Sequence, residues 1–154
     1  MTQSAPKSPP NTRLNLDRFL PYRLNRLAHN VGSSLATIYA DAYGINRSQW
    51  RVMALLGQHE RLTAKQICAM TYMDKVKVSR AVSGLVDLEH LQTTPDKNDK
   101  RAVLLSFSPQ GRCLFEDMVP KVQRWEDDFL SKLSKDEVAQ LAHIIDKLDP
   151  SHEH

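Results

Sequence analysis

The chain has 154 residues and a formal net charge of +3, and 41% of its residues are hydrophobic and 25% charged. This length accommodates one domain with a single core, and the composition is that of a globular protein rather than a collagen-like, disordered or disulfide-rich one. No apolar run approaches the roughly 18 residues that span a bilayer, and the first ten residues lack the apolar stretch of a signal peptide. We therefore expect a cytoplasmic protein without a membrane partner.

The charge is unevenly distributed along the chain. Residues 1–115 contain 16 Lys and Arg against 8 Asp and Glu, whereas residues 116–154 contain 5 against 10. The basic part indicates a polyanionic partner for that part only. Charge alone does not distinguish DNA from RNA or an anionic membrane.

The N-terminal part predicts a leader followed by a long helix. Residues 1–15 are expected to be a disordered leader, because several prolines stand among polar residues without apolar periodicity. From Leu16 to Ala42 apolar residues recur every three or four positions, which indicates one stripe of a helix that Gly44 ends as a C-terminal cap. Pro21 must lie in or near the first turn, since deeper in the helix it would remove a hydrogen bond.

Further helices are marked by residues that cap a helix N-terminus. The predicted caps are Asn46 with Gln49, Thr63 with Gln66, Asp74, and Ser134 with Glu137. Ser108, followed by Pro109 at the first helical position, opens another helix. Its apolar stripe continues to Leu133, and Pro120 is expected to kink it.

After Leu91 the helical pattern stops. Val103, Leu105 and Phe107 alternate with other residues, and a charged segment, residues 96–100, precedes them. This pattern predicts a small hairpin with a charged tip. The predicted fold class is mainly α with a small β-hairpin wing.

Two short helices followed by a charged hairpin are typical of a winged helix-turn-helix domain. On the second of these helices Lys77, Arg80 and Gly84 are expected to face away from the apolar stripe, and such a helix fits a DNA major groove about 12 Å wide. The predicted DNA-binding residues are Thr63, Lys75, Lys77, Ser79, Arg80, Lys97, Asp99, Lys100 and Arg101. The alternative is a solvated helix face with an ordinary charged turn.

Three segments resemble the MarR family of bacterial transcriptional regulators. Residues 99–111, with the sequence DKRAVLLSFSPQG, are similar to the family's wing signature, which is Asp-x-Arg followed by an apolar strand, a hydroxyl residue and a glycine. Residues 44–52 resemble the family's entry into its second helix, and residues 78–80 resemble part of its recognition helix. The resemblance extends from about Leu16 to Leu148.

This resemblance implies a single MarR-like domain over residues 16–148, followed by a tail, residues 149–154. Residues 16–44 and 108–148 would form a helical dimerisation region, and residues 45–107 the winged helix-turn-helix domain. The implied protein is a homodimer that binds a near-palindromic operator in double-stranded DNA. Packing of the end helices within one subunit is the alternative, because spacing alone does not distinguish the two.

The resemblance also assigns a role to the wing. Arg101 would approach the minor groove while Asp99 holds it in position, and a local ion pair that only stiffens the turn is the alternative. Glu89 stands where family members commonly have the glycine that ends the recognition helix. Thr93 stands where many have an arginine. We therefore expect a differently closed helix and one phosphate contact fewer.

Members of this family release DNA when a small molecule binds or when a cysteine is oxidised. The segment from Leu16 to Val31 resembles the branch that responds to aromatic acids, such as hydroxycinnamates and benzoates, or to their CoA thioesters. The implied function is repression of an aromatic-acid catabolic operon, although sequence does not separate a repressor from an activator. The predicted effector-binding residues are Tyr22, Arg26, His29, Tyr39 and Trp50, which combine a carboxylate-binding face with aromatic rings. A solvated or dimer-contact face is the alternative.

Other chemistries have less support. Redox control would need a reactive thiol, and Cys113 beside Arg112 is a better candidate than Cys68, which we expect to be a small buried residue. The histidines share no metal-ligand spacing, and the sequence has no nucleophile motif, no glycine-rich phosphate loop and no paired carboxylates in an apolar setting. We therefore expect no enzyme, no metal and no cofactor. A winged helical module that binds proteins instead of DNA is the alternative from another class.

Overall fold

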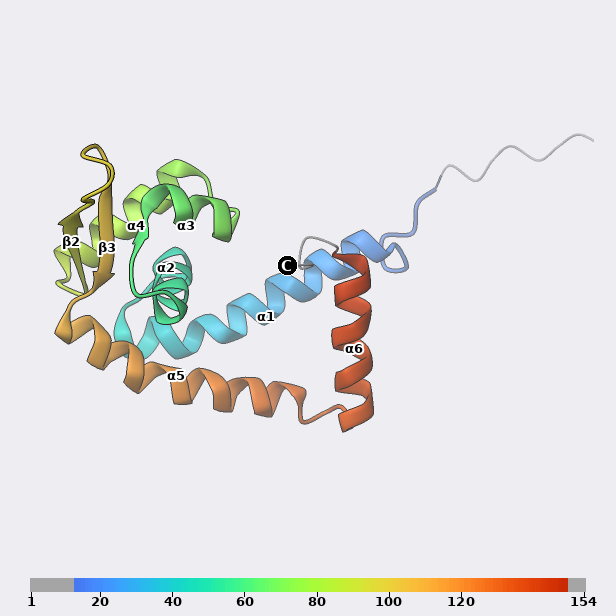
Figure 1. Ribbon diagram of the computed structural model, residues 1–154. Helices are drawn as coiled ribbons and strands as arrows, with labels where there is room; N and C mark the ends of the chain where they lie inside the picture. The colour runs from blue at the N-terminus through green and yellow to red at the C-terminus, as the bar shows by residue number, and fades with distance from the viewer. Residues whose placement is uncertain (1–12, 150–154) are drawn as a thin grey trace, which may run out of the picture. The chain divides into compact units, whose positions relative to one another are not determined.

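The computed structural model describes residues 13–149 (Figure 1). Most of the predicted leader and nearly all of the predicted tail lie outside the described residues. The chain forms two compact units, of which one ends at Ser34 and the other begins at Leu35. Within residues 13–149 no helix is long and apolar enough to cross a membrane.

The predicted fold class is confirmed, with one additional strand. The helices are α1 (Leu20–Tyr43), α2 (Arg47–Gln58), α3 (Ala64–Thr71), α4 (Lys75–Asp87), α5 (Pro109–Leu130) and α6 (Lys135–Leu148), and the strands are β1 (Leu62–Thr63), β2 (Leu91–Pro95) and β3 (Val103–Phe107). The predicted hairpin is β2–β3, and β1 pairs with the other edge of β3, so that the sheet is antiparallel in the order β1-β3-β2. A strand of two residues has no periodicity from which it could be predicted.

Every predicted N-terminal cap is present. The capping side chains are those of Asn46, Thr63, Asp74, Ser108 and Ser134, and each accepts a hydrogen bond from the backbone N–H three residues further on. At Asn46, Thr63 and Ser134 the side chain of the third helical residue bonds back to the cap, which completes a capping box. These bonds satisfy amides that have no partner within the helix.

Two helix boundaries differ from the prediction. The first helix begins at Leu20 rather than Leu16, because the backbone before it forms a turn closed by hydrogen bonds to Asn15. The helix that was expected to continue to Leu133 ends at Leu130, where a new turn begins. α5 continues through Pro120, and the kink there stays a prediction.

Helix α4 closes through Glu89, which adopts the left-handed conformation with a φ of 58°. Its N–H donates to the carbonyl of Val86 at 2.9 Å, and the N–H of His90 donates to the carbonyl of Leu85 at 2.8 Å. This is the Schellman arrangement, which commonly uses glycine. The expectation of a differently closed helix is therefore wrong. The glutamate takes the glycine conformation at a steric cost of about 1–2 kcal/mol.

Contacts from the start of α5 hold this strained residue in place. The Ser108 hydroxyl donates to the carbonyl of Glu89 at 2.5 Å, and the Ser108 N–H donates to the carbonyl of His90 at 3.1 Å. Gly111 lies so close that a Cβ there would be 1.8 Å from the His90 carbonyl oxygen. The first turn of α5 is therefore bonded directly to the end of α4 and the start of β2.

A column of aromatic rings forms part of the core of the second unit. The ring of Tyr39 stacks on Trp50 with centroids 5.5 Å apart, and Trp50 is 6.1 Å from Phe115, which is 5.1 Å from Phe107. These residues come from the end of α1, from α2, from α5 and from β3. The column joins the consecutive helices α1 and α2 to the consecutive elements β3 and α5, which follow much later in the sequence.

A polar cluster at the surface also joins α1 to α5. The Tyr43 hydroxyl donates to the Asp117 carboxylate and accepts a hydrogen bond from Lys121, whose Nζ is 2.8 Å from the same carboxylate. The bond from Lys121 lowers the pKa of Asp117, and the bond to Asp117 raises the pKa of Lys121. Both groups therefore keep their charges over a wider range of pH.

Substituting Glu89→Gly should stabilise the protein. Glycine removes the left-handed strain but adds backbone entropy to the unfolded chain, so we expect the free energy of unfolding to rise by about 0.5–1 kcal/mol. Urea unfolding measures this change. Glu89→Ala, which keeps the strain, should give no comparable gain, and Asp87→Gly inside α4 should destabilise. A loss of stability in Glu89→Gly would contradict this account of the helix end.

Candidate DNA-binding surface

Helix α4 has one buried face and one exposed face. Val78, Ala81 and Leu85 are buried, because α4 packs on α2 and α3. The exposed residues are Lys75, Val76, Lys77, Ser79, Arg80, Ser83 and, at the end of the helix, Asp87, and they include all four of the residues predicted to bind DNA from this helix. The exposed face is therefore polar and basic, with a valine near its start.

Gly84 does not belong to the exposed face on which it was predicted. A Cβ at this position would lie 2.7 Å from Nε2 of Gln49. Gly84 therefore faces α2, where the absence of a side chain allows the two helices to approach closely. Leu88, which was assigned to the apolar stripe, is 46% exposed because it lies at the C-terminal cap.

Asp74 organises the N-terminus of α4. Its carboxylate accepts the Lys77 N–H at 2.8 Å and lies 3.5 Å from the Lys77 Nζ. The backbone hydrogen bond is the main reason that the pKa of Asp74 is lowered from its usual 3.8. The stabilising effect of this cap is thus present above pH 3.8 and is lost as the pH falls through the lowered pKa. The ion pair also keeps the Lys77 ammonium group near the start of the helix.

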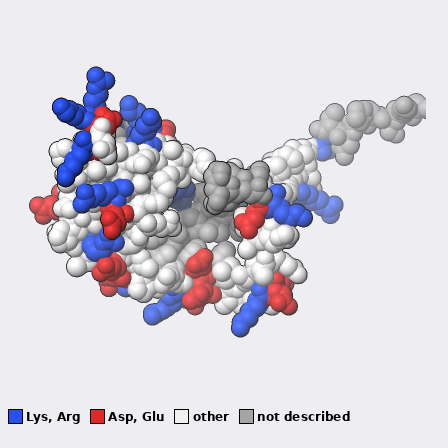
Figure 2. Space-filling model, viewed as in Figure 1, with Lys and Arg blue, Asp and Glu red and all other residues white. Residues whose placement is uncertain are grey.

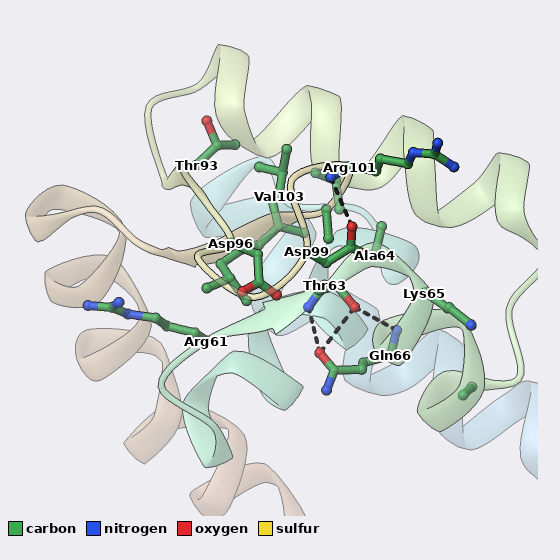
Figure 3. Close-up of a pocket in the computed structure, with 15 residues that line it drawn as sticks. Arg61, Thr63, Ala64, Lys65, Gln66, Thr93, Asp96, Asp99, Arg101 and Val103 are labelled. Carbon is green, nitrogen blue, oxygen red and sulfur yellow. Dashed lines mark hydrogen bonds between the residues drawn. The ribbon is translucent and has the colours of Figure 1, made fainter.

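The wing tip is shaped by two aspartates that bind backbone. Oδ1 of Asp96 accepts the Asn98 N–H at 2.9 Å, and Oδ1 of Asp99 accepts the Arg101 N–H at 2.9 Å. Figure 3 shows the Asp99 bond to the backbone of Arg101 while the guanidinium extends away from it. Among residues 13–149 no ion pair joins Asp99 to Arg101. Asp99 therefore holds the Arg101 backbone and not its charge.

The wing tip is also basic. Lysine and arginine side chains gather over the end of the molecule that carries the β2–β3 tip (Figure 2). Lys97, Lys100 and Arg101 are all exposed there. With both aspartates turned to the backbone, these cations are placed to meet an anionic partner.

A cavity of about 970 Å³ separates the wing from the start of α3, and Arg101 lines it together with Arg61 and Lys65 (Figure 3). Sequence reasoning did not select Arg61 or Lys65, because only the pairing of β1 with β3 brings them beside the wing. Thr63 also lines the cavity, but its hydroxyl accepts the Gln66 N–H and donates to Oε1 of Gln66. This hydroxyl therefore serves the capping box.

A second basic surface lies between α2 and α4. A groove of about 340 Å³ is lined by Arg47 and Ser48 at the start of α2 and by Lys77 and Arg80 of α4. Arg47 was not among the predicted residues. The sequence gives no signal for it, because only the packing of α2 on α4 brings Arg47 beside Lys77 and Arg80.

The predicted effector residues divide between the two compact units. Tyr22, Arg26 and His29 are exposed in the first unit. Tyr39 is only 1% exposed and Trp50 is half-buried in the second unit, where their rings stack on each other. The Tyr39 ring is part of the core, so it offers no surface to a ligand in this structure.

The two cysteines differ in exposure. Cys68 of α3 is half-buried and lines a cavity of about 630 Å³ with residues of α4, and Cys113 is exposed in the second turn of α5. Cys68 is therefore less enclosed than expected, whereas the exposure of Cys113 agrees with its selection as the better redox candidate.

The chain is similar to characterised regulators in sequence and in structure. A family model described as the MarR family matches residues 43–102. The multiple antibiotic resistance protein MarR of Escherichia coli is 26% identical over 131 residues, which cover 82% of this chain and 91% of the relative. The crystal structure of an E. coli MarR mutant in complex with operator DNA gives a TM-score of 0.78 at 22% identity and covers 89% of this chain and 99% of that one. The structure of Bordetella bronchiseptica BpsR gives a TM-score of 0.78 at 20% identity and covers 88% of this chain and 96% of that one.

The fold and the basic surface of α4 and the wing define a winged helix-turn-helix protein of the DNA-binding class. The family model over residues 43–102, the relatives and the shared fold show that this chain is similar to regulators of the MarR family.

Proposed function

We propose that the protein is a homodimeric repressor that binds a near-palindromic operator and releases it when a small aromatic acid or its CoA thioester binds. The observation that carries this proposal is the joint exposure of basic residues on α4 and on the wing tip. A helix of this kind enters the major groove, and the wing reaches the backbone or the adjacent minor groove. Arg80 is proposed to contact base edges, and Lys75, Lys97, Lys100 and Arg101 to contact phosphates or the minor groove.

Binding should depend on salt and on sequence. Arg80→Ala is expected to weaken operator binding about 5- to 150-fold per half-site, and Arg101→Ala to reduce the slope of log K against log salt by about 1 per half-site. Titration of labelled DNA from the region beside the gene, at several salt concentrations, measures both. Arg124→Ala, which removes an exposed arginine of α5, is the matched control and should bind as the parent does. Unchanged binding by both variants would contradict the groove assignment, and a parent without sequence preference would indicate a protein-binding module.

Dimerisation is supported by apolar side chains that a single chain leaves exposed. Helix α6 buries none of its residues, and Leu141, Ile144, Ile145 and Leu148 are 38–62% exposed. In the first unit Leu20, Leu24 and Leu27 of α1 are 48–52% exposed. Patches of this kind mark interaction surfaces, and a second copy of the chain would remove them from water.

The purified protein should sediment as a dimer at micromolar concentration. Ile145→Glu places a charge on the exposed apolar face of α6 and is expected to shift the equilibrium toward monomer, while Lys147→Glu on the same helix should leave the dimer intact. Sedimentation equilibrium measures both variants. A monomeric parent would exclude the homodimer.

The proposed effector site is the polar face of α1 in the first unit. The Arg26 guanidinium lies 3.6 Å from an Asp17 carboxylate oxygen and 5.8 Å from the centroid of the Tyr22 ring. Arg26 thus already contacts a carboxylate and an aromatic ring. The carboxylate of an aromatic acid would take the place of the Asp17 carboxylate. His29 lies on the same face. BpsR, whose DNA binding is regulated by 6-hydroxynicotinic acid, is a precedent on this fold.

Release should therefore depend on Arg26. In a panel of hydroxycinnamates, benzoates and their CoA thioesters, one compound should displace the parent from its operator, and Arg26→Ala should bind DNA normally but need a much higher concentration for release. Arg124→Ala, which removes an exposed arginine of α5, is the control. A panel in which no compound releases the parent would exclude this effector class and direct the search to oxidation of Cys113.

A further inference from the structure

The start of α4 carries exposed apolar side chains within a basic surface. Met70 at the end of α3, Tyr72 in the turn and Val76 in the first turn of α4 are 42%, 84% and 57% exposed. Lys75 and Lys77 flank the valine. An apolar group in this position does not contribute to the core.

Val76 is not explained by packing or by helix propensity. The buried stripe of α4 begins at Val78, whereas Val76 shares the outer face with Ser79, Arg80 and Ser83, which follow at intervals of three, four and seven residues. A β-branched residue at an exposed helical position also lowers helix stability relative to alanine or a straight-chain residue. Nothing in the fold of the single chain therefore requires a valine here.

We propose that Val76 contacts the 5-methyl group of a thymine in the major groove and so helps to determine which operator sequence is bound. This inference rests on the proposed DNA-binding function. The N-terminal residues of a recognition helix meet base edges, and the thymine methyl is the apolar group that those edges present. The cations beside Val76 match the DNA phosphates, and the hydroxyl and guanidinium groups of Ser79 and Arg80 provide hydrogen bonds to neighbouring bases.

Replacing single thymines by uracil tests this contact, because uracil lacks only the methyl group. The operator is first selected from a library of random duplexes, and each thymine is then replaced in turn. At one position in each half-site the parent should lose about fourfold in affinity, which is the value of one buried methyl group. Val76→Ala should bind the unmodified operator about fourfold more weakly per half-site and lose nothing further on uracil at that position.

Val103→Ala is the matched control, because Val103 is a valine of similar exposure, 49%, on β3. Val103→Ala should still lose about fourfold in affinity when uracil replaces the contacted thymine. Circular dichroism melting checks that Val76→Ala is folded. If Val76→Ala keeps the fourfold response, or if no thymine responds in the parent, the contact is excluded while selective DNA binding stands. If the parent shows no sequence preference, the result contradicts both the Val76 contact and the proposed function.

Discussion

The stack of Tyr39, Trp50, Phe115 and Phe107 is the contact on which the second unit depends. Aromatic rings bury 150–250 Å² each, and here they join α1, α2, α5 and β3. Gly57 allows this packing, since a Cβ there would lie 2.4 Å from the Phe115 ring. The helix-turn-helix and the wing thus pack on a common core, which fixes the positions of α4 and of the β2–β3 tip.

A second constraint lies where α4, the wing and α5 meet. The bonds from Ser108 to the carbonyls of Glu89 and His90, together with the close approach of Gly111, hold one residue in a conformation that costs energy. Strain of this kind persists only where the surroundings determine the backbone. The end of α4 is therefore positioned by α5, and not only by its own sequence.

The charges of the proposed DNA surface follow from how the acidic residues are used. Asp74 caps α4, and Asp96 and Asp99 bind backbone amides of the wing tip. Each carboxylate therefore binds backbone amides, and of the basic residues beside them only Lys77 is held in an ion pair, with Asp74. This division explains how a basic surface is built from a segment that contains nearly as many acidic as basic residues at its tip.

Elements whose defining bonds are local could be predicted from the amino-acid sequence. The caps at Asn46, Thr63 and Asp74 join residues three positions apart, and the order of helices and hairpin was enough to predict a winged helix-turn-helix fold. Features that depend on partners distant in sequence could be seen only in the folded chain. Strand β1 exists because it pairs with β3, Gly84 faces Gln49, and Tyr39 is in the core because Trp50 stacks on it. Spacing along one chain records the period of a helix or strand but not the element that will cover it.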